Sequence, residues 1–584
     1  MARFSDSAPF VLLDDARANS AAPARLYRDP LRVVVAHDVA EVTAALSEIK
    51  GCGLHAAGFL SYEAGFALEP KLGPSTKATV PLLWFGLFES YEEIRPEDVQ
   101  ALLPNTAGGW TGSPTPRLFR AAYDVEFCRV KDWISAGDIY QANLAIRADV
   151  ATTGHPLALY AGLRTRAGAG HGGIVWTGED WLLSLSPELF FALQEGKITT
   201  RPMKGTVARV PDPVADTANA VALVADPKQR AENLMIVDLL RNDLSRVAVP
   251  GSVEVPTLFA VESYPTVHTM TSTVTAQLRE GLGAIDIIEA IFPCGSITGA
   301  PKIRAMEVIS AVETEPRGAY TGSIGRIDTN GDAAFNVAIR TLHLHVGESR
   351  ATLGLGGGIV ADSEAGSEWR ECLAKGAFVA SRERFDLIET MRFDPEGGIH
   401  LLERHVARIG DSARTFGFPF DRHAARNELQ AATFRVDSPR RVRLMLSPTG
   451  QIAIEIGALP PVPDGPVLVA LAPLPVAADD YRLAHKTSNR DFYNTARASA
   501  GTFEVALVDA GGFITEGSFT NIFVKGEGAL LTPPLTRGLL PGVLRAELIA
   551  NGSAVEADLK REDLSGGFFI GNASRGLLAA VLTS

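Results

Sequence analysis

The sequence predicts an α+β fold divided into two domains. In its first part, strand-like runs such as "EDWLLSLSPELFFALQEGKITTRP" alternate with helix-like runs such as "KQRAENLMIVDLLRNDL". Hairpins interleaved with helices favour antiparallel sheets with flanking helices over a purely parallel sheet. Near residue 383 a helical run passes into a new strand, turn and helix. We therefore expect domains at 1–383 and 384–584, with an N-terminal lobe over about 1–110 that ends in the loop-rich stretch 104–117.

Composition narrows the class of protein. The 584 residues are 46% hydrophobic and 21% charged, with a formal net charge of −13, which is ordinary for a globular enzyme. An acidic chain does not suit nucleic acid or an anionic membrane, because phosphate binding needs a basic surface. The four cysteines show no metal-binding spacing. No apolar run reaches the ~20 residues of a membrane span, and no basic-then-apolar leader is visible. We expect a cytoplasmic protein.

A hairpin-like segment, "SPELFFALQEGKITTRPMKGT", contains the first candidate catalytic pair. Glu188 and Lys204 each lie eight residues from Gly196, at the turn. Cross-strand partners stand about 5 Å apart, so a simple register sets this carboxylate beside the amine. Pro202 makes the second strand an edge or ends it, which leaves the register open. An ordinary surface ion pair, worth ~0–1 kcal/mol, is the alternative to a functional role.

Two helix-like segments carry carboxylates. Residues 230–244 are apolar on almost every face, which predicts a buried helix. Asp238 can pair locally with Arg241 or Asn242, whereas Glu232 lacks such a partner and requires a cation. Residues 363–376 place one row of charges on a helix: Glu364, Glu368, Glu371 and Lys375. An exposed Glu371–Lys375 pair is one interpretation, and a buried row that holds Mg²⁺ is the other.

Glycine-rich turns supply candidate anion sites. "LGLGGGIV" (353–360) ends a strand with consecutive glycines, and "GSITGAPK" (295–302) opens into a helix. Backbone N–H groups can converge on an anion at both kinds of turn. A plain β-bulge is an equally good interpretation of the first.

These segments together resemble the chorismate-utilising enzymes, a family that includes anthranilate, aminodeoxychorismate, isochorismate and salicylate synthases. The resemblance covers roughly residues 1–380. It is carried in order by "GDIYQANL", "SPEL", "PMKGT", "AENLMIVDLLRNDL", "GSITGAPK", "YTGSIG", "FNVAIRT", "GGGIV" and "EWRECLAK". It implies that Glu232 and Glu371 bind Mg²⁺, with Glu368 close by. The residues that it implies for chorismate are Gly205, Thr206, His268, Ser296, Thr298, Tyr320, Arg340, Gly356 and Lys375.

Two positions discriminate within that family. Members of the family that add water to chorismate look to have a lysine at the position of Gln141. By this resemblance, Gln141 favours addition of ammonia over addition of water. Lys204 is similar to the lysine of aminodeoxychorismate synthases, where anthranilate synthases have alanine. A neutral Lys204 amine can attack the ring and expel a hydroxyl, with Glu188 as the general acid. We interpret Lys204 as a nucleophile, which requires a depressed pKa.

Residues 384–584 contain a second, different set of candidate functional motifs. "DYRLAHKTSNRDFYN" contains Lys486, "VALVDAGGFITEGSFTNIF" contains Glu516, and "LLPGVLRAELI" opens a helix at a phosphate-like turn. Individually Lys486 and Arg408 are more often plain surface residues. In this order the motifs resemble the fold-type IV pyridoxal-phosphate enzymes, which include branched-chain and D-amino-acid aminotransferases and aminodeoxychorismate lyase.

That resemblance implies pyridoxal 5′-phosphate as cofactor. Lys486 would bind it covalently and move protons, and Glu516 would pair with its ring nitrogen. The phosphate would be held by Arg408, the backbone N–H groups of Val543 and Leu544, and Ser574. Relatives often have a threonine where this chain has Leu544, so one phosphate-binding hydroxyl is missing. Thr390 and Arg392 are candidate substrate contacts.

The two resemblances together suggest that the two domains catalyse consecutive reactions. The expected reactions are chorismate plus ammonia to 4-amino-4-deoxychorismate, then elimination of pyruvate to give p-aminobenzoate for folate synthesis. No glutaminase signature is apparent, so a separate glutamine amidotransferase or free ammonium would supply the nitrogen. A homodimer through the second domain is compatible with the resemblance. The alternatives are a synthase fused to a D-amino-acid or branched-chain aminotransferase, and a non-catalytic chorismate-binding scaffold.

Overall fold

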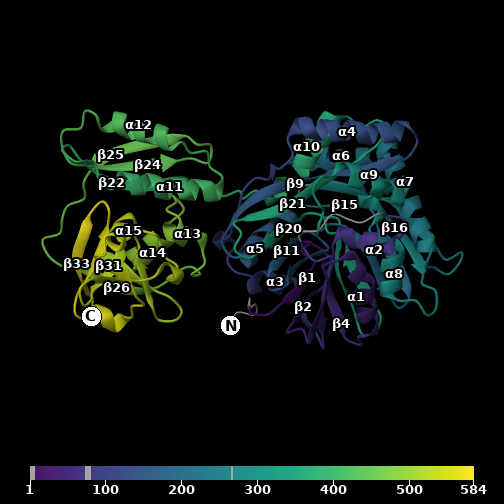
Figure 1. Ribbon diagram of the computed structural model, residues 1–584, viewed down its shortest axis with the longest axis horizontal. Helices are drawn as coiled ribbons and strands as arrows, with labels where there is room; N and C mark the ends of the chain where they lie inside the picture. Colours follow the sequence, from purple (N-terminus) through teal and green to yellow (C-terminus); the bar gives the residue numbers. More distant parts are fainter. Residues whose placement is uncertain (1–6, 73–79, 265–266, 584) are drawn as a thin grey trace. The chain divides into compact units, whose positions relative to one another are not determined.

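The computed structural model describes residues 7–72, 80–264 and 267–583 and divides into two compact units (Figure 1). The first unit comprises Met1–Pro104, Ser113–Val150 and Tyr160–Ala380. The second comprises Asn105–Gly112, Ala151–Leu159 and Ser381–Ser584. Among the described helices, none combines the length and the apolar character that a membrane span requires.

Two largely antiparallel sheets form the first unit. The order in one sheet is β17 (Gly299–Ala300), β9 (Gln141–Thr153), β21 (Arg350–Ile359), β20 (Thr341–His345), β11 (Asp180–Ser184), β10 (Gly172–Trp176), β1 (Phe10–Asp14), β2 (Ala24–Arg28) and β6 (Glu92–Ile94). The order in the other is β14 (Met203–Ala208), β16 (Val267–Gln277), β13 (Lys197–Arg201), β12 (Leu189–Gln194), β19 (Ala333–Asn336), β18 (Ser323–Ile327), β4 (His55–Leu60), β5 (Leu83–Phe88) and β3 (Arg32–Ala36), with β15 (Glu254–Ser263) against β16. Strands from before residue 104 thus complete both sheets.

Helices flank these sheets, as the sequence predicts. They include α1 (Val39–Gly51), α4 (Arg120–Ser135), α6 (Pro213–Ala225), α7 (Pro227–Ser245), α8 (Ala284–Ile291), α9 (Lys302–Val312) and α10 (Ala365–Gly376). Asp226 caps α7 by accepting from the N–H groups of Lys228 and Gln229, and Pro227 occupies the first turn. The prediction that α7 is buried all round is wrong, because Leu234 is 44% exposed. The predicted local pair is confirmed, with Arg241 Nη1 2.8 Å from Asp238 Oδ1.

The predicted hairpin register is also wrong in detail. Strands β12 and β13 pair with Leu189 opposite Arg201 and Gln194 opposite Lys197. The strand is interrupted at Pro202, and the following strand, β14, pairs with β16 rather than with β12. Glu188 and Lys204 are therefore not cross-strand partners. Proline cannot donate to a ladder, so a strand that contains it ends there and can change partner.

The second unit contains a small antiparallel sheet and a larger mixed one. The order in the small sheet is β23 (Gly398–Ile399), β22 (Leu387–Asp394), β24 (Arg440–Leu446) and β25 (Ile452–Ala458). The order in the larger sheet is β28 (Ile514–Gly517), β27 (Glu504–Val508), β26 (Val467–Pro473), β33 (Gly576–Leu582), β32 (Phe568–Asn572), β29 (Asn521–Lys525), β30 (Leu530–Thr532) and β31 (Ala554–Glu556). Helices α11 (Leu402–Phe416) and α12 (Arg422–Thr433) lie beside the small sheet (Figure 1). The unit also contains α13 (Tyr481–Ala484), α14 (Asp491–Ala500) and α15 (Val543–Ala550).

Amphipathic packing explains the small sheet and its helix. Ile409, Ala413 and Phe416 recur at helical spacing on α11 and are buried in one cluster with apolar residues of β22 and β24. The helix ends at Gly417, whose φ of 68° places it in the left-handed conformation of a helix C-terminus. The loop-rich stretch at 105–112 belongs to this unit, because the Trp110 ring packs at 5.0 Å from that of Phe416.

Candidate functional sites

Lys204 lies in the first unit at the centre of a group of polar side chains. It stands on β14, its side chain is 20% exposed, and its Nζ is 3.5 Å from Oε2 of Glu232 on α7. Asn233, the next residue on α7, directs its side-chain amide at the Lys204 carbonyl at 3.5 Å. Helix α7 thus fixes both the backbone and the amine of Lys204.

The glycines of β21 form one wall of this site. A Cβ added to Gly358 would lie 3.0 Å from Lys204 Nζ and 2.8 Å from Nε2 of Gln141. Both amide atoms of Gln141 are buried, and neither has a hydrogen-bond partner among the described residues. An unpartnered buried amide is costly, so this side chain is suited to a bound polar ligand. Gln141 and Lys204, 63 positions apart in the sequence, therefore meet over Gly358.

Glu188 is the candidate acid of the same site. It is 4% exposed and accepts a hydrogen bond of 2.7 Å from Ser296 Oγ. Burial raises the pKa of Glu188 to about 7, although the Ser296 hydrogen bond and the Lys204 charge both favour its ionised form. Near neutral pH this carboxyl can therefore hold a proton and give it up. Ser296, in turn, lies 3.3 Å from the buried Cys294 Sγ.

Several other residues predicted to bind chorismate lie on or beside β21 and β14. Lys375 Nζ donates to the Gly356 carbonyl at 3.0 Å, and a Cβ on Gly356 would lie 3.0 Å from the Tyr320 hydroxyl. The Gly205 carbonyl accepts from Thr269 Oγ1 at 2.9 Å. The structure places the remaining four residues as follows: Thr206 Oγ1 is 3.5 Å from Thr269 Oγ1, His268 is buried beside Asp216, Thr298 donates to the Cys294 carbonyl, and Arg340 is half-buried with a φ of 51°.

The predicted magnesium ligands have other partners in this structure. Glu232 faces Lys204, Glu371 pairs with Lys375 at 2.9 Å, and Glu368 accepts from Ser363 Oγ at 2.7 Å. Within the described part of the chain, no three His, Cys, Asp or Glu side chains cluster closely enough to hold a metal ion. Lysines thus pair with Glu232 and Glu371, and these carboxylates do not by themselves form a metal site among the described residues. Magnesium remains a prediction from the family resemblance.

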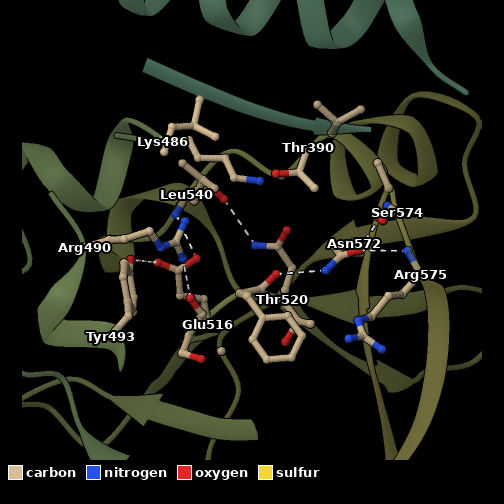
Figure 2. A pocket seen from close by; sticks show the side chains of 18 of the residues that line it. Thr390, Lys486, Arg490, Tyr493, Glu516, Thr520, Leu540, Asn572, Ser574 and Arg575 are labelled. Carbon is tan, nitrogen blue, oxygen red and sulfur yellow. Dashed lines mark hydrogen bonds between the residues drawn. The ribbon is translucent and has the colours of Figure 1, made fainter. Parts of the chain in front are cut away.

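The second unit encloses a cavity of about 410 Å³ around Lys486. Lys486 and Thr390, which lies on β22, both line this cavity. Figure 2 shows the Lys486 amine and the Thr390 hydroxyl facing each other. Burial, together with the charge of Arg408, lowers the pKa of Lys486 to about 7. This amine is therefore substantially uncharged at neutral pH, as a nucleophile for a carbonyl group must be.

Glu516 closes one end of this cavity. It is 3% exposed, it accepts from Tyr493 Oη, and its Oε2 accepts from the Leu540 N–H at 3.1 Å (Figure 2). Burial raises the pKa of Glu516 to about 8. A protonatable carboxyl in this position could share a proton with a ring nitrogen. Tyr493 was not predicted from the sequence, where nothing distinguishes it from an ordinary core tyrosine.

Arg408 is held by a buried acid that sequence reasoning also missed. Its Nε and Nη2 donate to the two carboxylate oxygens of Glu389 at 2.8 and 2.7 Å, and His405 Nδ1 lies 2.5 Å from Glu389 Oε2. Burial opposes the ionised form of Glu389, yet Arg408 and His405 hold its pKa at about 2. A charged residue among the apolar positions of "LIETM" was the available signal.

The far end of the cavity suits a phosphate. The N-terminus of α15 faces it with Gly542 and Val543, next to Ser574, and Arg408 reaches the adjoining Pro541 carbonyl at 3.1 Å. Ser574 Oγ and His405 Nε2 are buried without a hydrogen-bond partner in the described residues. Free helix N–H groups, a guanidinium and unpartnered polar atoms match a bound phosphate, so the residues fit pyridoxal phosphate. Leu544 follows on α15, and the exposed Arg392 is not among the lining residues.

Comparisons with known proteins agree with these two arrangements. Residues 15–381 match the family model of chorismate binding enzyme, and residues 386–581 match amino-transferase class IV. The aminodeoxychorismate synthase component 1 of Escherichia coli is 46% identical over 258 residues, which cover 44% of this chain and 56% of that protein. The anthranilate synthase component 1 of Streptomyces coelicolor is 39% identical over 268 residues, or 46% of this chain and 51% of that protein. The chain thus spans about half the length of the curated relatives it matches.

A solved structure extends the comparison to the fold. The anthranilate synthase component I of Streptococcus pneumoniae superposes with a TM-score of 0.52 and 25% identity, covering 65% of this chain and 94% of that one. Fold and site therefore define a chorismate-binding domain joined to a class IV aminotransferase-like domain, as the sequence predicted. The chain belongs to the family of chorismate binding enzymes.

Proposed function

We propose that this protein makes p-aminobenzoate in two steps. The first unit would aminate chorismate to 4-amino-4-deoxychorismate, and the second would eliminate pyruvate from that product. The observation that carries the proposal has two parts. In the first unit Gln141 and Lys204 meet over Gly358, and the Lys204 charge acts on the protonatable Glu188. In the second unit another lysine, Lys486, whose pKa is about 7, lines the cavity. Relatives whose printed names include aminodeoxychorismate synthase support the first step.

The first step would use two groups in complementary protonation states. Lys204, once uncharged, attacks the chorismate ring and expels its hydroxyl, and Glu188 gives its proton to that hydroxyl as it leaves as water. Ammonia then displaces the lysine nitrogen from the ring carbon and restores the free amine. The amide of Gln141 would orient the incoming nitrogen. Its two buried polar atoms, which have no hydrogen-bond partner among the described residues, support this role. Glu232 and Glu371 remain the proposed ligands of Mg²⁺.

The second step would rely on pyridoxal phosphate, which serves as an electron sink when it is bound. Lys486 would hold it and carry a proton, while Arg408, Ser574 and the first N–H groups of α15 would fix its phosphate. Glu516 would share a proton with the ring nitrogen. The Thr390 hydroxyl faces Lys486 and can relay a proton between that amine and the substrate (Figure 2). An amidotransferase subunit or free ammonium would supply nitrogen to the first site.

An aminotransferase activity is the second candidate for the C-terminal unit, because the matching family model is that of class IV aminotransferases. One assay separates the two. Purified protein receives chorismate, ammonium, Mg²⁺ and pyridoxal phosphate, and the products are separated by chromatography. Formation of p-aminobenzoate and pyruvate supports elimination. Accumulation of aminodeoxychorismate together with amino-group exchange between amino and keto acids would instead establish the aminotransferase.

A further inference from the structure

Glu504 is a buried carboxylate that the proposed reactions do not use. It is the first residue of β27 and is 0% exposed. Its Oε1 accepts from the N–H groups of Val505 and Ser518 at 3.0 and 2.9 Å, and from Ser518 Oγ at 2.5 Å. Its Oε2 accepts from the Phe519 N–H at 3.1 Å and from Thr520 Oγ1 at 2.9 Å. Both oxygens thus act as acceptors, as those of an ionised carboxylate do.

Four of these five donors belong to one turn, Gly517–Thr520, which joins β28 to β29 and lines the cavity of the second unit. Glu516, which precedes the turn, and Thr520, which ends it, both line this cavity (Figure 2). The carbonyls of the turn are held from elsewhere, since Arg490 donates to that of Ser518 at 2.5 Å and Asn572 to that of Phe519 at 3.1 Å. Glu504 supplies the acceptors that the N–H groups of the turn require.

The fit between Glu504 and the turn leaves no room for a side chain at Gly517. A Cβ added there would lie 2.8 Å from Glu504 Oε2 and 2.4 Å from Thr520 Oγ1. An amide would not replace the carboxylate, because each oxygen faces at least one N–H and an NH₂ group in either position would meet another donor. The turn therefore selects a full negative charge, although burial makes such a charge costly.

The charge of Glu504 acts on Glu516, the proposed partner of the cofactor ring nitrogen. Burial is the largest cause of the Glu516 pKa of about 8, and the Glu504 charge raises this pKa further. The hydrogen bonds from Tyr493 and from the Leu540 N–H, and the charge of Arg490, all act in the opposite direction. The two buried carboxylates thus differ in role: Glu504, surrounded by donors, carries the charge, and Glu516 can hold the proton.

We propose that Glu504 is a positioning residue of the second site, which fixes the turn after Glu516 and keeps a proton on the pair that Glu516 forms with the cofactor ring nitrogen. This inference rests on the proposed pairing of Glu516 with pyridoxal phosphate, and it applies to elimination and to amino-group transfer alike. Without a shared proton, the Glu516 carboxylate would repel the lone pair of the ring nitrogen. The negative charge of Glu504 therefore favours a ligand that has this nitrogen.

A comparison of two ligands tests the proposal without requiring turnover. 1-Deazapyridoxal 5′-phosphate keeps the aldehyde and the phosphate of the cofactor but has a C–H group in place of the ring nitrogen. Fluorescence titration of cofactor-free protein gives the affinity for each ligand. Because Lys486 and the phosphate site meet the same groups in both ligands, the ratio of the two affinities reports on the ring nitrogen.

The expected ratio depends on pH. Below about pH 8, where Glu516 holds a proton, the wild type should prefer pyridoxal phosphate about tenfold, as one charge-assisted hydrogen bond allows. This preference should decrease as the pH rises through about 8. Glu504→Gln removes the charge that favours the proton, so its preference should decrease at a lower pH. At pH 8 it should be about threefold smaller than that of the wild type, the effect of roughly half a unit in proton affinity.

Glu504→Asp separates the charge from the reach of the side chain. Its carboxylate keeps the charge but is too short to hold all the donors, so it should weaken both ligands alike and retain the preference. A purely structural role predicts the same equal loss for Glu504→Gln. An unchanged ratio at every pH in folded Glu504→Gln therefore overturns the proposal. If that variant does not fold, loss of the preference in Glu504→Asp overturns it.

Asp509→Asn is the matched control. Asp509 accepts from the N–H groups of Gly511 and Phe513 at 2.8 and 2.9 Å, in the turn that joins β27 to β28, and it does not belong to the described lining of the cavity. Its substitution should lower the thermal midpoint and leave the ratio at the wild-type value. A ratio as low as that of Glu504→Gln would attribute the effect to stability and overturn the proposal.

The wild type separates this inference from the function on which it rests. A wild type without preference for the ring nitrogen at any pH refutes the pairing of Glu516 with the cofactor, whatever the variants show. A wild type that has the preference, beside a Glu504→Gln variant with the same preference and the same pH dependence, refutes the role of Glu504 alone.

Discussion

At the scale of single residues, burial gives ordinary side chains unusual proton affinities. Glu188 and Glu516 are acids whose pKa is raised to about 7 and about 8, and Lys486 is an amine whose pKa is lowered to about 7. In each case removal from water disfavours the charged form. Three groups that would be fully ionised on a surface therefore titrate near neutrality, where proton transfer is efficient.

The first prediction concerns Glu188. Because the proposed role needs its protonated form, the first step should slow as pH rises above about 7, where this carboxyl loses its proton. The amide of Glu188→Gln cannot act as an acid, so this variant should lower the rate by about 100-fold or more. Its remaining rate should no longer decrease as the pH rises above about 7. Chorismate consumption measured from pH 6 to 9 checks it. A wild-type rate that rises through this range would contradict the role.

The second prediction concerns Lys486. An uncharged amine captures an aldehyde, so the rate of pyridoxal phosphate uptake by cofactor-free protein should increase with pH and level off above about 7. Stopped-flow absorbance gives this rate directly. Lys486→Ala should show no covalent uptake at any pH. A wild-type rate that does not change between pH 6 and 8 would show that the amine is not titrating there.

At the scale of elements, strands and helices from distant parts of the chain support each reactive group. Strand β22 supplies Glu389 and α11 supplies His405 and Arg408, so that one buried carboxylate orients the guanidinium at the phosphate end. Strand β21 supplies glycines where a side chain would displace Lys204 and Gln141. Both arrangements yield predictions that do not depend on the identity of the substrate.

The third prediction follows from Glu389. Glu389→Gln removes the charge that fixes Arg408 and should weaken pyridoxal phosphate about tenfold, which corresponds to ~1.4 kcal/mol. Pyridoxal, which lacks the phosphate, should lose much less affinity. Fluorescence titration of cofactor-free protein measures both constants, with the exposed Glu428→Gln as control. Equal losses for the two ligands would mean that Glu389 supports the fold rather than the phosphate site.

The fourth prediction concerns β21. The Cβ of Gly358→Ala would lie within 3.0 Å of Lys204 Nζ, so the amine must move and the first step should slow about tenfold or more. The control is Gly162→Ala on α5 (Pro156–Ala167), where an added Cβ meets nothing within 4 Å. Turnover and thermal midpoint are measured for both. A slower first step with an unchanged midpoint supports the placement, whereas wild-type turnover contradicts it.

At the scale of the whole molecule, the described residues of each site belong to a single unit. Gln141, Gly358 and Glu232, which surround Lys204, lie in the first unit, and the described residues that line the cavity around Lys486 lie in the second. The two reactions can therefore be separated by mutation. This independence leads to a fifth prediction.

Lys204→Ala should lose the first step and keep the second, and Lys486→Ala should do the reverse. Neither variant alone should convert chorismate and ammonium to p-aminobenzoate, but an equimolar mixture should do so, because the intermediate can diffuse from one protein to the other. Chromatographic detection of p-aminobenzoate checks the mixture. Failure of the mixture, while each variant retains its own step, would show that the intermediate is not released.

Much of this protein is determined by local sequence. Alternating strands and helices gave the α+β class, and ordered motifs pointed to both families that the matches report. Local spacing likewise predicted the Asp238–Arg241 and Glu371–Lys375 pairs, since residues three or four apart on a helix are neighbours.

Only the tertiary structure decided which distant groups meet. Lys204 forms its ion pair with Glu232 on a distant helix, and its charge also acts on Glu188. Glu188 is not its cross-strand partner, because Pro202 ends one strand before the next pairs with β16. Tyr493 was not predicted from the sequence, because its hydrogen bond to the buried Glu516 is visible only once two distant elements have been placed together. Periodicity records the contacts within an element. Burial and the pairing of charges depend on contacts between elements, which the fold alone creates.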